Sequence, residues 1–394
     1  MGTRRPPLLG RAAFAALAVV LGGVSASRAA PPALLAAPAA GTPAPEFAQA
    51  LAPRVFSFPD DHGPHPGFRQ EWWYITGNLD AAGGERFGFE LTFFRYALAA
   101  PSSGAPAGPV VPAARPSLWR AREIYMAHFA VTDTARKTFR FSQKLAREAL
   151  GLAGAQAAPF AVWIDDWSLR SVEPSVAARP GWRLHAAEEG YELELTLTPL
   201  MPPVLNGEAG LSRKSAAPGA ASYYYSIPRL AVRGRLLRGG QALSVGGLAW
   251  LDREWGSGGI SAAQSGWDWF ALQLDDGACL MFYALRDSDG HRDRYSAGTW
   301  IPAAGEARPL VSADVAIAVT GYWRNPRGVR YPAAWRVRVP AVALSVGVHP
   351  VLAAQELTGT PPYWEGAVDV AGVLGEREAG GRGYVELVGY APER

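Results

Sequence analysis

From about residue 55 onward, short segments of alternating apolar and polar residues are separated by turn residues. Alternation with a period of two is typical of β-strands that place one face on a core. In the first half the pattern predicts strands at residues 72–79, 87–95, 124–131, 138–141, 191–198, 223–236 and 243–255. In the second half it predicts strands at residues 295–301, 315–323, 335–339, 363–370 and 384–390. We therefore expect an antiparallel, all-β protein.

Three stretches depart from this pattern. Residues 142–150 (SQKLAREAL) are good helix formers behind Ser142, which is suited to capping a helix, and they predict a short helix. Residues 97–117 and 207–221 are rich in Gly, Ala and Pro. We expect both to be mobile loops at the rim of a barrel.

The chain also contains an internal repeat. Residues 72–80 (WWYITGNLD) align without gaps with residues 267–275 (WDWFALQLD), and both copies then turn and continue into a second apolar strand. The place of Trp73 in the first copy is taken by Asp268 in the second. Two tandem antiparallel barrels follow, and we expect domains at residues 54–256 and 257–394.

Composition and charge narrow the function classes. Of the 394 residues, 49% are hydrophobic and 19% are charged, which is enough to build sizeable cores. The formal charge of +3 is spread along the chain without a basic block, so we expect no DNA or other nucleic acid as a partner. The 14 Trp, 14 Tyr and 15 Phe favour an aromatic-lined cavity that holds an apolar small molecule. We expect a monomer.

The sequence of the N-terminus predicts an export signal. Arg4 and Arg5 precede an apolar run over residues 12–24, which is too short to span a bilayer, and residues 1–29 are therefore predicted to be a signal peptide. The Sec route is expected, and the arginine pair also allows twin-arginine export. We expect a periplasmic or secreted protein without a lipid anchor. Residues 30–53 form an Ala/Pro-rich linker, and the single cysteine, Cys279, predicts an inert buried thiol.

Several of these segments resemble one known family. They are HGPHP at 62–66, EWWY at 71–74, GFELTFFR at 88–95, DREW at 252–255, GWDWF at 266–270 and YWEGA at 363–367. They are similar to the AttH and carotenoid 1,2-hydratase family over nearly the whole predicted mature chain. The resemblance implies two lipocalin-like domains and an association with ABC-type export systems, hence an ABC-type permease as a partner. Relatives include alkene hydratases and pericyclases, so the resemblance fixes the fold more firmly than the reaction.

Asp268 is the first candidate for a general acid. In a strand it shares a face with Phe270 and Leu272, and desolvation on such an apolar face raises the pKa of a carboxyl group. Hydration of an alkene needs a proton donor, and aromatic rings stabilise the carbocation that forms. We expect Trp267 and Trp269 to supply such rings. The alternative is that Asp268 closes the barrel beside two structural tryptophans.

Asp252 and Glu254 form a second candidate. They lie two residues apart in a predicted strand and share a face with Trp250, whereas Arg253 and Trp255 lie on the other face. Two carboxyl groups at this spacing can divide acid and base work or share one proton. The alternative is an ion-paired seam at the domain junction. Trp255 is also expected to contact the ligand.

The first repeat offers a further ligand-binding cluster. Glu71 shares a face with Trp73, and together with Tyr74 these residues are expected at a barrel mouth in contact with the ligand. The alternative is that the cluster closes the end of the barrel, as the first-strand tryptophan of lipocalins does. Glu90 and Glu365, inside otherwise apolar strands, are candidates for inward polar groups or for buried salt bridges to an arginine such as Arg95.

The histidines give weaker signals. His128 alternates into an apolar strand and is a candidate base or substrate contact, with a hydrogen-bonded core histidine as the alternative. His62 and His65 lie three residues apart in a loop, but no further ligands of a metal site follow, and we expect no metal. The chain has no Gly-rich nucleotide loop, no G-x-S-x-G turn and no H-E-x-x-H helix, so no cofactor is expected and a classical serine hydrolase is disfavoured.

Two function classes follow. The first is a cofactor-independent enzyme that hydrates a double bond of an isoprenoid, carotenoid or other lipid-like ligand by Asp or Glu general-acid catalysis. The second is a periplasmic carrier that binds such a ligand unchanged and passes it to or from an ABC-type permease. A pericyclase, in which pocket shape alone promotes ring closure, is a third possibility.

Overall fold

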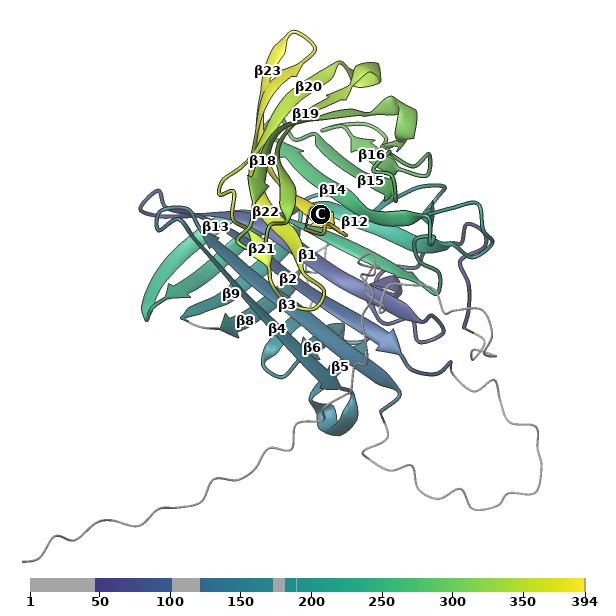
Figure 1. Ribbon diagram of the computed structural model, residues 1–394. Helices are drawn as coiled ribbons and strands as arrows, with labels where there is room; N and C mark the ends of the chain where they lie inside the picture. Colours follow the sequence, from purple (N-terminus) through teal and green to yellow (C-terminus); the bar gives the residue numbers. More distant parts are fainter. Residues whose placement is uncertain (1–46, 101–120, 173–180, 189, 393–394) are drawn as a thin grey trace, which may run out of the picture.

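The chain forms two strongly curled antiparallel sheets, shown one above the other in Figure 1. The structure, a computed structural model, describes residues 47–100, 121–172, 181–188 and 190–392. The predicted signal peptide and most of the predicted loop at 97–117 lie outside the described residues. Each sheet curls around its own apolar core, as expected for tandem lipocalin-like barrels.

The first sheet has the strand order β4-β3-β2-β1-β13-β12-β9-β8-β7-β6-β5, with β10 and β11 paired to β12. Its strands are β1 Gln70–Ala81, β2 Arg86–Ala97, β3 Glu123–Asp133, β4 Thr138–Arg147, β5 Ala153–Gln156, β6 Ala161–Ile164, β7 Trp167–Ser171, β8 Trp182–Glu188, β9 Tyr191–Pro199, β10 Val204–Leu205, β11 Leu211–Arg213, β12 Ala221–Arg238 and β13 Gln241–Gly256. Two 3-10 turns accompany it, η1 Asp60–His62 and η2 Ala149–Gly151.

The second sheet has the order β17-β16-β15-β14-β23-β22-β20-β19-β18, with β21 paired to β22. Its strands are β14 Gln264–Leu274, β15 Cys279–Asp287, β16 Ala297–Ile301, β17 Arg308–Val311, β18 Ala316–Arg324, β19 Arg330–Val339, β20 Leu344–Pro350, β21 Glu356–Leu357, β22 Tyr363–Leu374 and β23 Arg377–Val388. It carries the 3-10 turns η3 Ser312–Asp314 and η4 Pro340–Val342.

The strands that begin the two sheets occupy equivalent places. β1 pairs with β2 and with the last strand of its sheet, β13, and β14 pairs with β15 and with the last strand of its own sheet, β23. These are the two copies of the repeat found in the sequence. All the predicted strands overlap observed ones, whereas the short strands β5 to β8 and β20 had no clear sequence pattern.

The two sheets pack against each other through their outward faces. β1 contacts β23, β2 contacts β22, and β12 contacts β14. A third apolar cluster fills this interface and contains Tyr74, Tyr224, Trp250 and Trp269. Because Trp73 and Ile75 of β1 lie in the core of the first sheet at the same time, β1 is buried on both faces.

Polar contacts join the two sheets around this cluster. The Arg86 guanidinium lies 2.8 Å from the Asp369 carboxylate, and the Arg382 guanidinium lies 2.8 Å from that of Asp80. The Asn78 amide donates a hydrogen bond of 3.1 Å to the Gly383 carbonyl. These partners come from opposite sheets, so they fix how one sheet sits on the other.

The predicted helix at residues 142–150 is wrong. The chain continues strand β4 to Arg147, paired along its length with β3, and only η2 follows. A helix there would have needed an apolar face against the core, but Leu145 is 70% exposed. Pairing with the neighbouring strand therefore outweighs local helix propensity.

Two predicted loops also have more structure than expected. Residues 207–221 contain β11, which pairs with β12 and buries Leu211 and Ser212, so the prediction of a mobile excursion is wrong. The described part of the predicted linker, residues 47–53, packs on the first sheet: Ala50 is buried, and the Ala52 carbonyl accepts a hydrogen bond from Tyr223.

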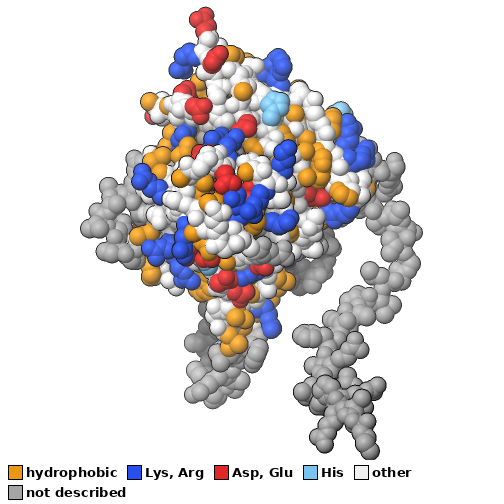
Figure 2. All heavy atoms as spheres, turned by 90° about the vertical axis from the view of Figure 1, so that its left-hand side faces the viewer, with side chains coloured by type: hydrophobic (Ala, Val, Ile, Leu, Met, Phe, Trp, Pro, Cys, Tyr) orange, Lys and Arg blue, Asp and Glu red, His pale blue; other side chains and the backbone are white. Residues whose placement is uncertain are grey.

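Three further features concern the single cysteine, transmembrane helices and the surface charges. Burial raises the pKa of Cys279 to about 11, so this thiol stays protonated. Among the described residues no helix is both long and apolar enough for a transmembrane segment. Figure 2 shows one face of the molecule, on which basic, acidic and hydrophobic side chains are interspersed.

Candidate functional site

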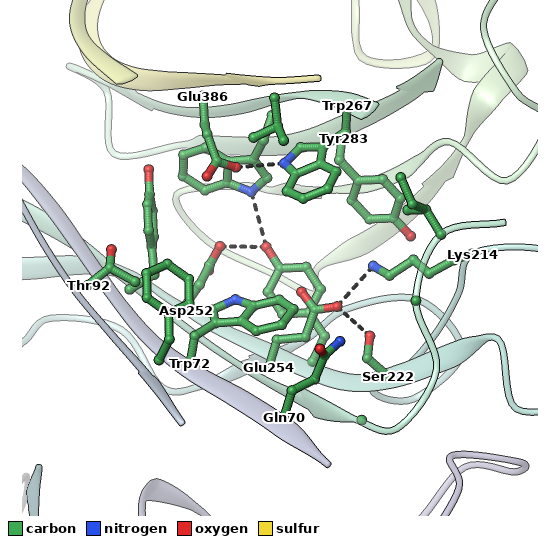
Figure 3. A pocket seen from close by; sticks show the side chains of 18 of the residues that line it. Gln70, Trp72, Thr92, Lys214, Ser222, Asp252, Glu254, Trp267, Tyr283 and Glu386 are labelled. Atoms are coloured by element: carbon green, nitrogen blue, oxygen red, sulfur yellow. Dashed lines mark hydrogen bonds and ion pairs between the residues drawn. The ribbon is translucent and has the colours of Figure 1, made fainter. Parts of the chain in front are cut away.

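A pocket lies between the two sheets, lined by outward-facing residues of β1, β2, β12 and β13 on one side and of β14, β15 and β23 on the other. Its cavity measures about 140 Å³. This is close to the size of an engineered cavity that accepts benzene, so the enclosed part takes one ring-sized group. Figure 3 shows the side chains around this space. Its aromatic lining includes Trp72, Tyr74, Phe94, Tyr224, Trp267, Trp269 and Tyr283.

The repeat explains why tryptophans and carboxyl groups meet here. Tyr74 of β1 and Trp269 of β14 are equivalent in the repeat, and both point outward into the pocket. Asp252 of β13 lies opposite Tyr74 in the strand register, and Glu386 of β23 lies opposite Trp269. Asp252 and Glu386 are therefore equivalent residues of the two halves. Figure 3 shows their carboxyl groups approaching the pocket from opposite sides.

Asp252 is held by three hydrogen-bond donors. Ser226 and Trp250 donate to Oδ1, both at 2.6 Å, and Tyr224 donates to Oδ2 at 2.5 Å. Burial raises the pKa of Asp252 to about 7, although these three hydrogen bonds oppose the shift. Trp269 in turn donates to the Tyr224 hydroxyl at 3.1 Å, so a chain of hydrogen bonds joins the two sheets. The predicted Asp252 carboxyl group is thus in the pocket and titrates near neutrality.

Glu254 forms the polar end of the pocket. Its carboxylate lies 3.0 Å from the Lys214 ammonium and accepts a hydrogen bond from Ser222. Lys214 also lies over the ring of Tyr283, 4.3 Å from its centre. Burial lowers the pKa of Lys214, but the Glu254 charge and hydrogen bond, together with Tyr283 and Asp252, outweigh it, and the pKa lies above its usual value. This end therefore carries a buried ion pair, as the seam alternative predicted, and both partners line the pocket.

Glu386 faces Asp252 from the second sheet. Trp267 donates a hydrogen bond of 2.6 Å to its Oε2. Burial raises the pKa of Glu386 to about 7, the Trp267 hydrogen bond opposes this shift, and the charges of Asp252 and Glu254 add to it. Two carboxyl groups on opposite walls thus titrate near neutral pH, which suits proton transfer.

Two further acids lie behind the pocket wall. Glu90 of β2 and Glu365 of β22 are fully buried, and burial raises the pKa of each well above its usual value. Tyr74 donates a hydrogen bond to one Glu365 oxygen, but the other, and both oxygens of Glu90, lack a partner among the described residues. The predicted salt bridge of Glu90 to Arg95 is wrong, because Arg95 pairs with Glu71 and Glu123.

His128 lines the pocket as a neutral, hydrogen-bonded histidine. Burial lowers its pKa to about 3. Its Nε2 lies 2.9 Å from the amide nitrogen of Gln143, which can only donate, so Nε2 accepts and Nδ1 donates to the Tyr363 hydroxyl at 2.7 Å. Both ring nitrogens are therefore occupied. The structure supports the core-histidine alternative, and His128 shapes the pocket without being free to act as a base.

Asp268 does not reach the pocket. It points into the second sheet, opposite to Trp267 and Trp269, where it pairs with the Arg286 guanidinium and accepts a hydrogen bond of 3.0 Å from Tyr390. Burial raises its pKa and the Arg286 charge opposes that shift. The structure thus places Asp268, predicted as the general acid, outside the pocket, in the position that its barrel-closing alternative describes.

Glu71, Trp73 and Trp255 also lie away from the pocket, inside the first sheet. The Arg253 guanidinium lies 4.0 Å from the Trp73 ring centre and 2.8 Å from the Glu71 carboxylate. Burial would raise the pKa of Glu71, but the His65 hydrogen bond and the arginine charges hold it well below its usual value. Trp255 stacks on the His65 ring at 3.7 Å. Of the residues predicted to bind ligand, these three therefore do not line the pocket, whereas Tyr74 does.

Possible metal ligands gather elsewhere. His62 is hydrogen-bonded to the Tyr225 hydroxyl, and both ring nitrogens of His65 contact carboxylates. These contacts explain the two histidines without a metal. Among the described residues, one group has metal-ligand spacing: His185, Glu192 and Glu194. Glu194 already pairs with Arg235 at 2.8 Å, so this cluster is explained by cross-strand ion pairs.

The sequence patterns pointed to neither Glu386 nor Lys214. Glu386 had a usable signal, because it is the acidic residue in an apolar run, YVELV at 384–388, of a predicted strand. Lys214 had none, since it lies in a Gly/Ala/Pro-rich stretch that resembles a surface loop. Only the pairing of β11 with β12 brings it to the pocket.

Comparison with known proteins shows the family to which this chain belongs. The family model described as AttH-like matches residues 49–390. The chain belongs to the AttH-like family. An AttH-type protein from Nitrosomonas europaea has a crystal structure with a TM-score of 0.74 and 34% identity, covering 88% of this chain and 100% of that one. A comparison with curated proteins found no match.

A second solved structure is more distant from this AttH-like chain. Kievitone hydratase from Nectria haematococca gives a TM-score of 0.65 at 15% identity, covering 88% of this chain and 97% of that one. At this identity the likeness shows a shared two-sheet fold. The AttH-like chain and a named hydratase therefore have the same architecture.

Proposed function

We propose that this AttH-like protein adds water to a carbon–carbon double bond of an apolar molecule held between its two sheets. The observation that carries the proposal is a pair of carboxyl groups, Asp252 and Glu386, on facing walls of an aromatic pocket, where burial raises the pKa of each to about 7. A general acid works best when its pKa lies near the operating pH. Both carboxyl groups meet this condition.

Hydration of an alkene needs both a proton donor and an environment that stabilises the positive charge of the carbocation. A carboxylic acid gives its proton to one alkene carbon, the other carbon becomes a cation, and water adds there and loses a proton. Aromatic faces attract cations, with Trp the most effective. Trp72, Trp267 and Trp269 lie on the pocket wall beside the two carboxyl groups. The shared fold with kievitone hydratase supports water as the second reactant.

The size of the pocket limits the ligand. Because the cavity of about 140 Å³ accepts one ring-sized group, a long polyene or isoprenoid enters with one end only. The polar end at Lys214 and Glu254 is suited to a hydroxyl or carbonyl group of the ligand. A small unsaturated terpenoid is therefore a suitable first substrate for tests.

The test is incubation of the purified protein with a panel of unsaturated terpenoids, followed by mass spectrometry. We expect a product heavier by one water. Asp252→Asn should lower the rate by at least tenfold, because it removes a titrating group from the wall. Asp268→Asn is the matched control: it also changes a buried aspartate, but one outside the pocket, and a folded variant should keep the activity.

A carrier is the second candidate, favoured by one observation. Both oxygens of Asp252 already accept hydrogen bonds from the protein, as expected for a group that only shapes a binding site. Ligand that co-purifies with the protein and is recovered unchanged after incubation across the panel would favour the carrier over the hydratase. In that case the ABC-type permease and the export route remain the proposed context.

A further inference from the structure

The two equivalent carboxyl groups differ in what their oxygens contact. On Asp252, Oδ1 accepts two hydrogen bonds and Oδ2 accepts one. On Glu386, Oε2 accepts the Trp267 hydrogen bond, and no donor among the described residues reaches Oε1. Unlike the unpaired oxygens of Glu90, Oε1 of Glu386 is not fully buried. Since Glu386 lines the pocket, Oε1 is open to it.

An open oxygen decides which group can touch a ligand. Both oxygens of Asp252 already accept hydrogen bonds from protein donors, and Asp252 is only 3% exposed, so a ligand has little access to this carboxyl group. Nothing has to be displaced from Oε1 of Glu386. Figure 3 shows Glu386 entering the space from the side of the second sheet, next to Trp267.

We propose that Glu386 is the carboxyl group that contacts the ligand and transfers the proton, whereas Asp252 is a positioning residue that holds Tyr224. The contact follows from the pocket geometry alone. The proton transfer rests on the proposed hydration, and the two parts are tested separately below.

The proposed step balances with one carboxyl group. The O–H bond of the Glu386 acid breaks, and the π electrons of the alkene form a C–H bond with its proton, which leaves a carbocation and a Glu386 carboxylate. A lone pair of water then forms the C–O bond. The resulting oxonium gives its extra proton to the carboxylate, and the acid is restored. The net reaction consumes one alkene and one water.

Several titratable groups face Glu386 and influence its charge. From β13 these are Asp252 and Glu254, from β22 Glu365, and from β2 Glu90. The phenols of Tyr74 and Tyr363 also interact with it. Of these groups, Asp252 and Glu254 raise the pKa of Glu386 by their charges and so favour its protonated form. A control variant must therefore separate Glu386 from Asp252.

The test of contact is the affinity for a neutral probe, β-ionone, measured by calorimetry between pH 6 and pH 8. An apolar probe that covers Oε1 removes water from it, which costs far more for the carboxylate than for the acid. With the pKa of Glu386 at about 7, we expect binding about tenfold weaker at pH 8 than at pH 6. In Glu386→Gln the affinity for β-ionone should differ by less than twofold between pH 6 and pH 8.

Asp252→Asn is the matched control. It should keep the pH dependence, with the midpoint moved to lower pH, because it removes a negative charge that raises the pKa of Glu386. A pH dependence that persists in Glu386→Gln and disappears in Asp252→Asn would overturn the proposal. If Glu386→Gln does not fold, the indole N–H resonance of Trp267 serves instead. In the wild-type protein its chemical shift should change with pH, with a midpoint near pH 7, and should also change when β-ionone binds. A chemical shift that responds neither to pH nor to β-ionone would also overturn the proposal.

The two proposals fail in different ways. If the affinity follows Glu386 but no terpenoid gains water, the contact stands and the hydratase function fails. If a hydrated product forms and Glu386→Gln still makes it at the wild-type rate, the hydratase stands and the role of Glu386 is overturned. We expect Glu386→Gln to lower the rate by at least a hundredfold, and Asp252→Asn to lower it less.

Discussion

The hydroxyl of Tyr74 in the first sheet donates a hydrogen bond of 2.5 Å to the carboxyl group of Glu365 in the second. Both side chains are buried, and the other Glu365 oxygen has no partner among the described residues. Each group would be costly to bury alone, because a buried polar group without a hydrogen bond is destabilising. This contact therefore ties β1 to β22 behind the pocket.

Tyr74→Phe should destabilise the protein by about 1–3 kcal/mol, because it leaves the Glu365 carboxyl group without its donor. The measurement is equilibrium unfolding in urea. Tyr96→Phe is the control, since Tyr96 lines the same pocket and its hydroxyl makes no hydrogen bond within the described part of the chain. Equal losses in the two variants would show that the Tyr74 hydroxyl does not stabilise the interface.

Glu90→Gln should make the stability less dependent on pH. Burial raises the pKa of Glu90 well above its usual value of 4.5, so above pH 4.5 the native protein keeps a proton that the unfolded chain releases. Raising the pH therefore favours unfolding, by on the order of 1 kcal/mol per pH unit until the native pKa is reached. Glutamine cannot titrate and removes this contribution.

The measurement for Glu90→Gln is the free energy of unfolding at several pH values from 5 to 8. Glu376→Gln, in the exposed turn between β22 and β23, is the control and should keep the wild-type slope. A slope in Glu90→Gln as steep as that of the wild-type protein would mean that Glu90 is ionised in the native state.

Arg253→Met should destabilise the protein by about 3–5 kcal/mol, because it removes a charged partner of the fully buried Glu71. Its guanidinium also donates to the Trp72 and Gly63 carbonyl groups. Thermal and urea unfolding measure the loss. Arg235→Gln, which breaks an exposed ion pair with Glu194, should cause no measurable change. A small loss in Arg253→Met would contradict the structural role assigned to this network.

Gly88→Ala should disturb the contact between the two sheets. A Cβ at Gly88 would lie 2.7 Å from the Ala367 Cβ and 2.7 Å from the Tyr384 hydroxyl, both in the second sheet. We expect a loss of about 1–3 kcal/mol from this overpacking, together with weaker β-ionone binding. Gly83→Ala, where a Cβ meets open space, is the control. Unchanged stability in Gly88→Ala would show that the sheets can shift without cost.

The two-barrel fold could be predicted because alternation and the repeat act locally and agree. The same alternation explains why Asp268 lies outside the pocket. It places Asp268 and the pair Trp267 and Trp269 on opposite faces, so the aromatic prediction and the acid prediction could not both hold for one pocket. In β1 and β14 both faces are buried, and an apolar sequence does not show which face meets a ligand.

The position of the ligand site depends on contacts between the halves, which no single segment encodes. Asp252 and Glu254 were found from their spacing, and they line the pocket as well as forming an ion-paired seam. Glu386 becomes prominent only when β23 faces β13 across the interface. Lys214 depends on one short strand pairing. Long-range packing therefore determined the part of the site that local patterns missed.

Burial of β1 on both faces has a consequence for synthesis on the ribosome. The first sheet can close its own core as soon as β13 has emerged, but the outer face of β1 is covered only by strands of the second sheet, the last of which is β23. The nascent protein thus exposes part of a hydrophobic aromatic surface while its second half is being translated. Slow elongation or a truncated message would prolong that exposure and favour aggregation.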